Sequence, residues 1–236
     1  MKLAVNVDHI ATIREARRHT IPEPVLAALL AEQAGAEGIV CHIRSDRRHI
    51  KERDLHLLKQ TVNTNLNIEM GATDEMKHIA MDIKPDIVSL VPERDEEITT
   101  EGGLDVLANE DHLQAHIQEL RQAGIRVSIF VDPDIDQIDA CQRVGVDLIE
   151  INTGKYADLR PGEKRDQAYK EIVQAAKRGA GSGLEIHAGH GLDYFNVRPV
   201  ATIPEIREFS IGFAIVARAA LVGIDRAVRE MIALIQ

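Results

Sequence analysis

Eight short apolar runs, rich in β-branched residues, recur along the chain with helical hydrophobic spacing between them. The runs span residues 3–7, 38–43, 66–70, 86–91, 126–131, 147–152, 184–188 and 208–212. Short apolar runs of this kind are typical of buried strands, whereas apolar residues that return every three to four positions are typical of helices. The pattern therefore predicts a repeating unit of strand, loop and helix.

Helical spacing is clearest in two places. Leu26, Leu29 and Leu30 precede Gly35, and Leu113, Ile117 and Leu120 precede Gly124. Glycine directly after the last apolar position is a common helix terminator. Further helices are predicted over residues 74–83, 134–144, 164–178, 214–222 and 225–235. The longest predicted loops, 92–109 and 153–163, both follow strands, where lids usually lie.

Strands joined by helices run parallel, and repeated right-handed crossovers can close a sheet on itself. Eight such units predict an α/β fold, a TIM (β/α)8 barrel with extra helices, as a single catalytic domain over residues 1–236. An open doubly wound sheet is the alternative that the same pattern allows.

Polar residues close several runs, namely Asn6, His42, Glu69, Glu150 and His190. In a parallel barrel these strand ends meet at one mouth, where barrel enzymes have their active sites. Residues two apart share a face of a strand. The pairs expected on the inner face are Asn6 with Asp8, His42 with Arg44, Asn67 with Glu69, and Glu150 with Asn152. Ile68, Ile149 and Ile151 are then expected to face the helices.

Glu69 is the sharpest catalytic candidate, because burial at the end of an apolar strand raises the pKa of a carboxyl and suits it to general base catalysis near neutral pH. His42 and His190 add imidazoles that exchange protons in the same range. The alternative is a self-satisfied polar layer, with Glu69 in a salt bridge to Arg44 and two neutral core histidines. No metal site is predicted at His187 and His190, since strand alternation points them differently and no cluster of ligands accompanies them.

Glycine and arginine placement predicts two anion sites. Residues 188–192 (AGHGL) follow the seventh run, and residues 210–213 (SIGF) lead from the eighth run into a helix, whose N–H groups can bind phosphate. The second site is the basic segment 44–49 (RSDRRH), because arginine forks match phosphate oxygens. Tight glycine turns and a solvated basic turn are the alternatives. Arg14, Arg17 and Arg18, expected in the first loop, can add charge to either site, and residues 99–103 either close over the mouth or cap a helix.

Composition and charge limit the possible partners. The 236 residues are 44% hydrophobic and 28% charged, as in ordinary soluble domains. A formal net charge of -10 argues against general binding to nucleic acid or anionic membranes. The two cysteines are too few for a disulfide framework, and neither a cleavable leader nor a membrane-length apolar run is seen. We therefore expect a cytoplasmic protein without nucleic-acid or membrane partners.

Several motifs, collinear from the first strand to the eighth, resemble the pyridoxine 5'-phosphate synthase family. They are residues 6–12 (NVDHIAT), 42–50 (HIRSDRRHI), 67–70 (NIEM), 91–93 (VPE), 99–105 (TTEGGLD) and 188–192 (AGHGL). Several long motifs in one order are far more specific than any single glycine signature.

The resemblance implies a barrel transferase of vitamin B6 synthesis, which condenses 3-amino-2-oxopropyl phosphate with 1-deoxy-D-xylulose 5-phosphate and releases phosphate and water. It implies proton acceptors at His42 and Glu69, a proton donor at His190, and transition-state stabilisation by Glu150. The implied contacts to the amino ketone phosphate are Asn6, Arg17, Gly191, Gly212 and Phe213. The implied contacts to the deoxyxylulose phosphate are Asp8, His9, Arg44, His49 and Thr99. The family also implies a homo-octamer built from dimers and no metal or organic cofactor.

Two positions depart from the family pattern, which commonly has histidine in place of Phe213 and often in place of Asn152. Phe213 cannot make the side-chain contact to phosphate that a histidine would make, but its backbone N–H is still available. We therefore expect phosphate binding to be weaker but not lost. Two other functions fit parts of the sequence. A phosphosugar aldolase or epimerase needs one acid and one base and explains one anion site, whereas a barrel that senses a phosphorylated metabolite needs Arg44 but neither Glu69 nor His42.

Overall fold

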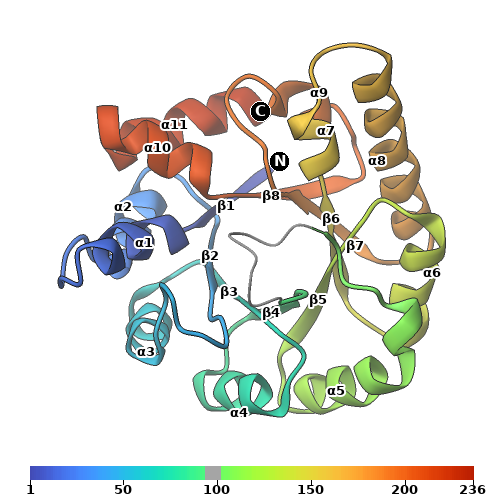
Figure 1. Cartoon of the computed structure of the whole chain (residues 1–236), viewed down its shortest axis with the longest axis horizontal. Helices are drawn as coiled ribbons and strands as arrows, with labels where there is room; N and C mark the ends of the chain where they lie inside the picture. Colours follow the sequence, from blue (N-terminus) through green and yellow to red (C-terminus); the bar gives the residue numbers. More distant parts are fainter. Residues whose placement is uncertain (94–101) are drawn as a thin grey trace.

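A computed structural model of the chain describes residues 1–93 and 102–236, and its strands form a closed barrel (Figure 1). Eight parallel strands pair in chain order, and β8 pairs back with β1. They are β1 Lys2–Asn6, β2 Gly38–His42, β3 Asn65–Met70, β4 Ile87–Leu90, β5 Arg126–Val131, β6 Leu148–Asn152, β7 Glu185–Gly189 and β8 Ile206–Ile211. The predicted barrel is confirmed, with strand bounds shifted by one or two residues, and the open sheet is excluded.

Helices surround the barrel in Figure 1. They are α1 Asp8–Ala16, α2 Pro24–Gln33, α3 Glu52–Thr61, α4 Asp74–Ile83, α5 Glu110–Gln122, α6 Ile135–Val144, α7 Gly154–Asp158, α8 Glu163–Gly181, α9 Val197–Ala201, α10 Phe213–Val222 and α11 Ile224–Ile235, with a 3-10 turn η1 at Leu107–Asn109. The sequence pattern missed α1, α3, α7 and α9, which are short or strongly charged. None of the helices in the described ranges is long and apolar enough to cross a membrane.

Strand alternation sorts the side chains as predicted. Ile68, Ile149 and Ile151 are fully buried in the apolar layer between strands and helices. Each such side chain contributes about 1.5–3 kcal/mol when buried. Gly179 lets α8 approach this layer closely, because a Cβ there would lie 2.7 Å from Ile186 Cδ1. The outer face of the barrel is thus apolar, whereas the inner face carries polar residues together with a few apolar ones such as Val40 and Leu148.

The lower interior of the barrel is polar as well. His187 on β7 lies next to Glu150 in the strand register, and its Nε2 lies 2.9 Å from Glu185 Oε1. Its Nδ1 lies 3.5 Å from Glu208 Oε1. His187 therefore contacts glutamates of β7 and β8 within the barrel, whereas His190 follows β7 with a left-handed backbone conformation. In residues 1–93 and 102–236 no group of three or more His, Cys, Asp or Glu is placed to hold a metal.

The expectation that Arg14 lies in the first loop was wrong. Residues after β1 form α1, with the acidic Asp8 in its first turn, where the helix dipole favours negative charge. Arg14 is buried, and its guanidinium donates to both carboxylate oxygens of Asp54 at 2.8 and 2.7 Å. Its charge is used inside the fold, so Arg14 cannot contribute to an anion site.

Candidate active site

The first three strands are tied together at their carboxyl ends by side-chain hydrogen bonds. Asn6 Nδ2 donates to Asp8 Oδ2 at 2.8 Å and lies 3.5 Å from Glu69 Oε2. Asp8 Oδ1 accepts the backbone N–H of His42 at 2.7 Å. The predicted inner-face residues Asn6, Asp8, His42 and Glu69 therefore meet at one place.

Glu93, which directly follows Pro92, is a site residue that the reasoning from single strand ends missed. Its Oε1 lies 3.0 Å from His42 Nε2 and 3.2 Å from the backbone nitrogen of Gly71, and its Oε2 accepts the N–H of Ser45 at 3.0 Å. Burial opposes ionisation, but the hydrogen bonds from His42 and Ser45 outweigh it and lower the pKa of Glu93 to about 2. The sequence does carry one sign of this role, because Glu93 is a polar residue just beyond the end of the fourth apolar run.

Glu150 is buried and Glu69 partly buried, and the charges of the two carboxyls interact. Burial raises the pKa of Glu69 well above its usual range, and the charges of Glu150 and Asp8 raise it further. Burial also raises the pKa of Glu150, to about 7, a shift that His187 opposes and Glu208 reinforces. Two such carboxyls can exchange protons with a ligand near neutral pH.

Two glycines leave room for the acid and base groups. A Cβ at Gly189 would lie 2.8 Å from the Ser210 carbonyl oxygen and closer still to Glu150 Oε1. A Cβ at Gly154 would lie 2.8 Å from His190 Cδ2. Both positions therefore need glycine for close approach, not for a turn.

His190 has an unusual backbone conformation at the mouth. Its φ is 75°, in the left-handed region, and Gly191 follows with φ 74°. A non-glycine residue there costs about 1–3 kcal/mol, and such residues cluster at functional sites. The hydroxyl of Thr153 lies 2.7 and 2.6 Å from the carbonyl oxygens of Gly189 and His190, which holds the turn in place. Burial lowers the pKa of His190, whose ring lies 6.0 Å from that of Phe130.

A cavity of about 1080 Å³ opens beside His190 at this end of the barrel. Asn152 lies on its wall, donates from Nδ2 to Asp132 Oδ1 at 2.8 Å, and accepts the N–H of Gly154 at 2.9 Å. Asn152 thus joins the end of β5 to the start of α7. Both contacts use the side-chain amide of Asn152, one of the two positions at which the sequence departs from the family pattern.

The first predicted anion site lies at the N-terminus of α10. Gly212 precedes the helix, no side chain caps it, and its first N–H groups are therefore available to an anion. Phe213 is 70% exposed, and its ring lies 5.4 Å from that of His9 in an edge-to-face arrangement. Burial lowers the pKa of His9, although Asp8 opposes the shift.

The second predicted anion site is only partly formed by its arginines. Arg47 forms ion pairs with Glu52 and Glu75, and Arg48 forms one with Asp46, so the charges of both arginines are used in ion pairs outside the mouth. Arg44, two residues beyond the end of β2, is 3% exposed, and its Nε lies 3.9 Å from Asp46 Oδ1. His49 lies with its ring 6.1 Å from that of His42, and burial lowers its pKa.

Two predicted contact residues are not joined to the mouth by any described interaction. Arg17 follows α1 as its C-cap and is exposed, and no hydrogen bond or ion pair within residues 1–93 and 102–236 connects it to the site. Thr99 lies outside the described residues.

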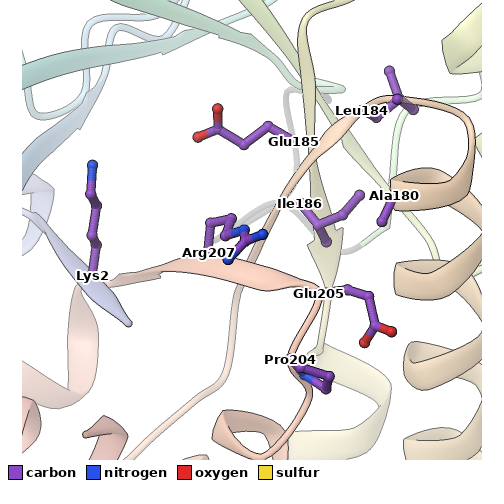
Figure 2. Close-up of a pocket in the computed structure, with 9 residues that line it drawn as sticks. Lys2, Ala180, Leu184, Glu185, Ile186, Pro204, Glu205 and Arg207 are labelled. Carbon is purple, nitrogen blue, oxygen red and sulfur yellow. The ribbon is translucent and has the colours of Figure 1, made fainter.

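A second cavity, of about 660 Å³, lies at the opposite end of the barrel. Figure 2 shows Lys2, Glu185, Glu205 and Arg207 around it, all near the amino ends of strands. Barrel enzymes have their chemistry at the carboxyl ends of the strands, so the candidate active site is the mouth around Asn6, His42 and Glu69. The cavity beside His190 lies at the same end, and of the predicted site residues that the structure describes only His190 lines it.

The closed barrel, with acid and base groups where its strands end, has the architecture of a (β/α)8-barrel enzyme. Solved structures confirm the fold. 3-Hexulose-6-phosphate synthase superposes with a TM-score of 0.67 at 13% identity, covering 100% of both chains. Phosphoribosyl anthranilate isomerase from Thermus thermophilus superposes with a TM-score of 0.62 at 12% identity, covering 99% of this chain and 98% of that one.

Sequence similarity then identifies the family. The chain belongs to the family described as pyridoxal phosphate biosynthesis protein PdxJ, which matches residues 3–236. Pyridoxine 5'-phosphate synthase of Syntrophotalea carbinolica is 56% identical over 229 residues, which cover 97% of this chain and 96% of the relative. The protein of the same name from Geobacter sulfurreducens is 54% identical over 235 residues, which cover 100% of this chain and 98% of the relative.

Proposed function

We propose that this enzyme makes pyridoxine 5'-phosphate by condensing 3-amino-2-oxopropyl phosphate with 1-deoxy-D-xylulose 5-phosphate, with release of phosphate and water. The similarity to synthases of that name over the whole chain supports the reaction. The proposed chemistry is supported by four groups at the mouth of the barrel: the carboxyls of Glu69 and Glu150, whose pKa values are raised, and the imidazoles of His42 and His190.

The reaction moves a proton at every stage. The substrate amine adds to the sugar ketone and gives an imine. Proton removal and phosphate loss follow, and an aldol-type closure with dehydration forms the aromatic ring. We assign proton acceptance to His42 and Glu69, donation to His190, and transition-state stabilisation to Glu150. Because burial lowers the pKa of His190, its protonated form is a strong donor.

The two phosphates fit two separate anion sites. We place the amino ketone phosphate at the N-terminus of α10, with contacts from Asn6, Arg17, Gly191, Gly212 and Phe213. We place the deoxyxylulose phosphate near the end of β2, with contacts from Asp8, His9, Arg44, His49 and Thr99. The uncapped α10 and the buried Arg44 support this division.

The alternatives use less of the site. An aldolase or epimerase needs one acid and one base, and the likeness to 3-hexulose-6-phosphate synthase is one of fold alone. A metabolite-sensing barrel has no use for carboxyls whose pKa values are raised by burial, since ionising them disfavours folding. The first alternative therefore uses only some of the acid and base groups at the mouth, and the second leaves Glu69 and Glu150 unexplained.

We also propose that the enzyme acts in the cytoplasm as a homo-octamer built from dimers. Large apolar side chains are exposed on adjoining helices: Ile13 on α1 is 46% exposed, Leu26 on α2 is 57% exposed and Leu221 on α10 is 82% exposed. Single exposed apolar side chains are ordinary on protein surfaces, but contiguous patches of them mark interfaces, and we propose that these three helices contribute to one. Light scattering after size-exclusion chromatography tests the assembly, and a single monomeric species would contradict it.

The activity is tested by mixing the purified enzyme with both substrates and following pyridoxine 5'-phosphate and inorganic phosphate together. We expect both products to appear at equal rates and neither to appear when either substrate is left out. Phosphate release without pyridoxine 5'-phosphate would indicate a different reaction at the same mouth.

A further inference from the structure

Glu93 contacts His42 at the mouth but stands outside the residues assigned above to chemistry or substrate contact. The two side chains are 12% and 7% exposed, and Glu93 Oε1 lies 3.0 Å from His42 Nε2. The same carboxylate accepts the backbone N–H groups of Ser45 and Gly71, which follow β2 and β3. Glu93 is therefore held in place by two neighbouring strand ends while it contacts the imidazole of His42.

The contact determines which nitrogen of His42 carries a hydrogen. An ionised carboxylate can only accept hydrogen bonds, so His42 Nε2 must donate. A neutral imidazole has one N–H, and its other nitrogen then carries the lone pair. With Nε2 as the donor, Nδ1 is the basic nitrogen.

We propose that Glu93 is a positioning residue that fixes His42 as the Nε2–H tautomer, so that Nδ1 accepts the substrate proton, and that stabilises the resulting imidazolium. The inference rests on the proposed role of His42 as a proton acceptor. A proton moves from the substrate to Nδ1, its bonding electron pair stays on the substrate, and Glu93 remains ionised throughout. A carboxylate that orients a catalytic imidazole in this way acts on rate more than on binding.

The other charged and titratable groups around His42 act differently. Asp8 accepts its backbone N–H and not a ring nitrogen, and Glu69 is its in-register neighbour on β3. His49 meets its ring edge-on, and Arg44, two residues further along the chain, has its Nε 3.9 Å from Asp46 Oδ1. Glu93 is thus placed to fix the ring tautomer, a role that these contacts do not supply.

Glu93→Gln is the direct test, because glutamine has nearly the same shape but only one acceptor oxygen. If its oxygen faces His42 and Gly71, its amide group faces the N–H of Ser45. If its amide group faces His42, the tautomer reverses and the N–H of Gly71 loses its acceptor. Glu110→Gln is the matched control, since Glu110 is a carboxylate on α5 that is ion-paired with Arg143 away from the mouth.

The readouts are the imidazole ¹⁵N shifts of His42, assigned by comparison with His42→Gln, and the kinetic constants for both substrates. We expect an Nε2–H tautomer in the wild type and in Glu110→Gln, and its loss in Glu93→Gln. We expect kcat of Glu93→Gln to fall about 10- to 100-fold, as when other orienting partners are removed, with each KM within about threefold of wild type.

An Nδ1–H tautomer in the wild-type enzyme would overturn the proposal, as would a Glu93→Gln enzyme with unchanged shifts and full kcat. If Glu93→Gln does not fold, the wild-type spectrum alone decides. An Nε2–H tautomer in a wild-type protein without synthase turnover would support the role of Glu93 and overturn the proposed function, so the two failures are distinguishable.

Discussion

The buried ion pair between Arg14 and Asp54 is expected to stabilise both the fold and the basic segment near the mouth. Their side chains are 6% and 1% exposed, and two hydrogen bonds of 2.8 and 2.7 Å join them. Arg14 Nη2 also donates to the carbonyl oxygen of His49 at 3.0 Å, and Asp54 accepts the N–H of Lys51. One pair therefore anchors the segment that precedes α3.

Asp54→Asn would remove the one fully buried counter-ion that the described residues give Arg14, and would leave only the partly exposed carboxylates of Glu15 and Glu23, at 2.9 and 3.4 Å. Breaking a buried pair by removing one partner costs about 3–5 kcal/mol, because the remaining charge stays desolvated. Two hydrogen bonds to charged groups, at about 1.5–3 kcal/mol each, give a similar figure. We expect this loss in the free energy of unfolding, together with a raised KM for the deoxyxylulose phosphate, since His49 loses its support.

Urea unfolding at pH 7 measures the loss, with Asp139→Asn as the control. Asp139 pairs with Arg178 on the surface at 2.6 Å, and exposed pairs contribute about 0–1 kcal/mol. If Asp54→Asn lowered the free energy of unfolding by no more than the control does, the reasoning about the buried pair would be refuted.

Three further changes test the site. Gly189→Ala places a Cβ against Glu150 and the Ser210 carbonyl oxygen. We therefore expect the free energy of unfolding to fall by about 1–3 kcal/mol and kcat to fall as well. A fully active, equally stable variant would show that Glu150 has room to move. Glu150→Gln tests pH dependence: the unfolded carboxyl ionises near 4.5 and the native one near 7, so native stability falls as pH rises between these values. The variant should lose this slope and be about 3 kcal/mol more stable than wild type at pH 8, which thermal melts at pH 5 and pH 8 can check. Phe213→His should restore a side-chain contact and lower KM for the amino ketone phosphate; an unchanged KM in steady-state assays would place that phosphate elsewhere.

The barrel and most of its inner-face residues follow from local sequence pattern. Asn6, His42, Glu69 and Glu150 end strands whose alternate positions are aliphatic, so their direction could be predicted from a period of two. The same reasoning missed α1, because its residues are mostly polar and its one inward arginine is paired with Asp54, forty residues further along the chain.

Other features depend on contacts that no single segment reveals. Glu93 lies beyond a proline, and its importance follows from His42, Ser45 and Gly71, which come from two other strand ends. Gly189 looks like a turn residue in the sequence, but it is required because Glu150 projects from the neighbouring strand. Long-range packing of this kind is set by the closed barrel and is invisible in local spacing.

The central claim is that Glu69 takes part in proton transfer during ring formation. The most direct measurement compares wild type with Glu69→Gln at saturating concentrations of both substrates at pH 7, with pyridoxine 5'-phosphate and phosphate followed together. We predict that the wild type releases phosphate in step with product and that Glu69→Gln, folded as judged by circular dichroism, is slower by about 10²- to 10⁴-fold. A folded Glu69→Gln enzyme that makes pyridoxine 5'-phosphate at the full rate would contradict the account.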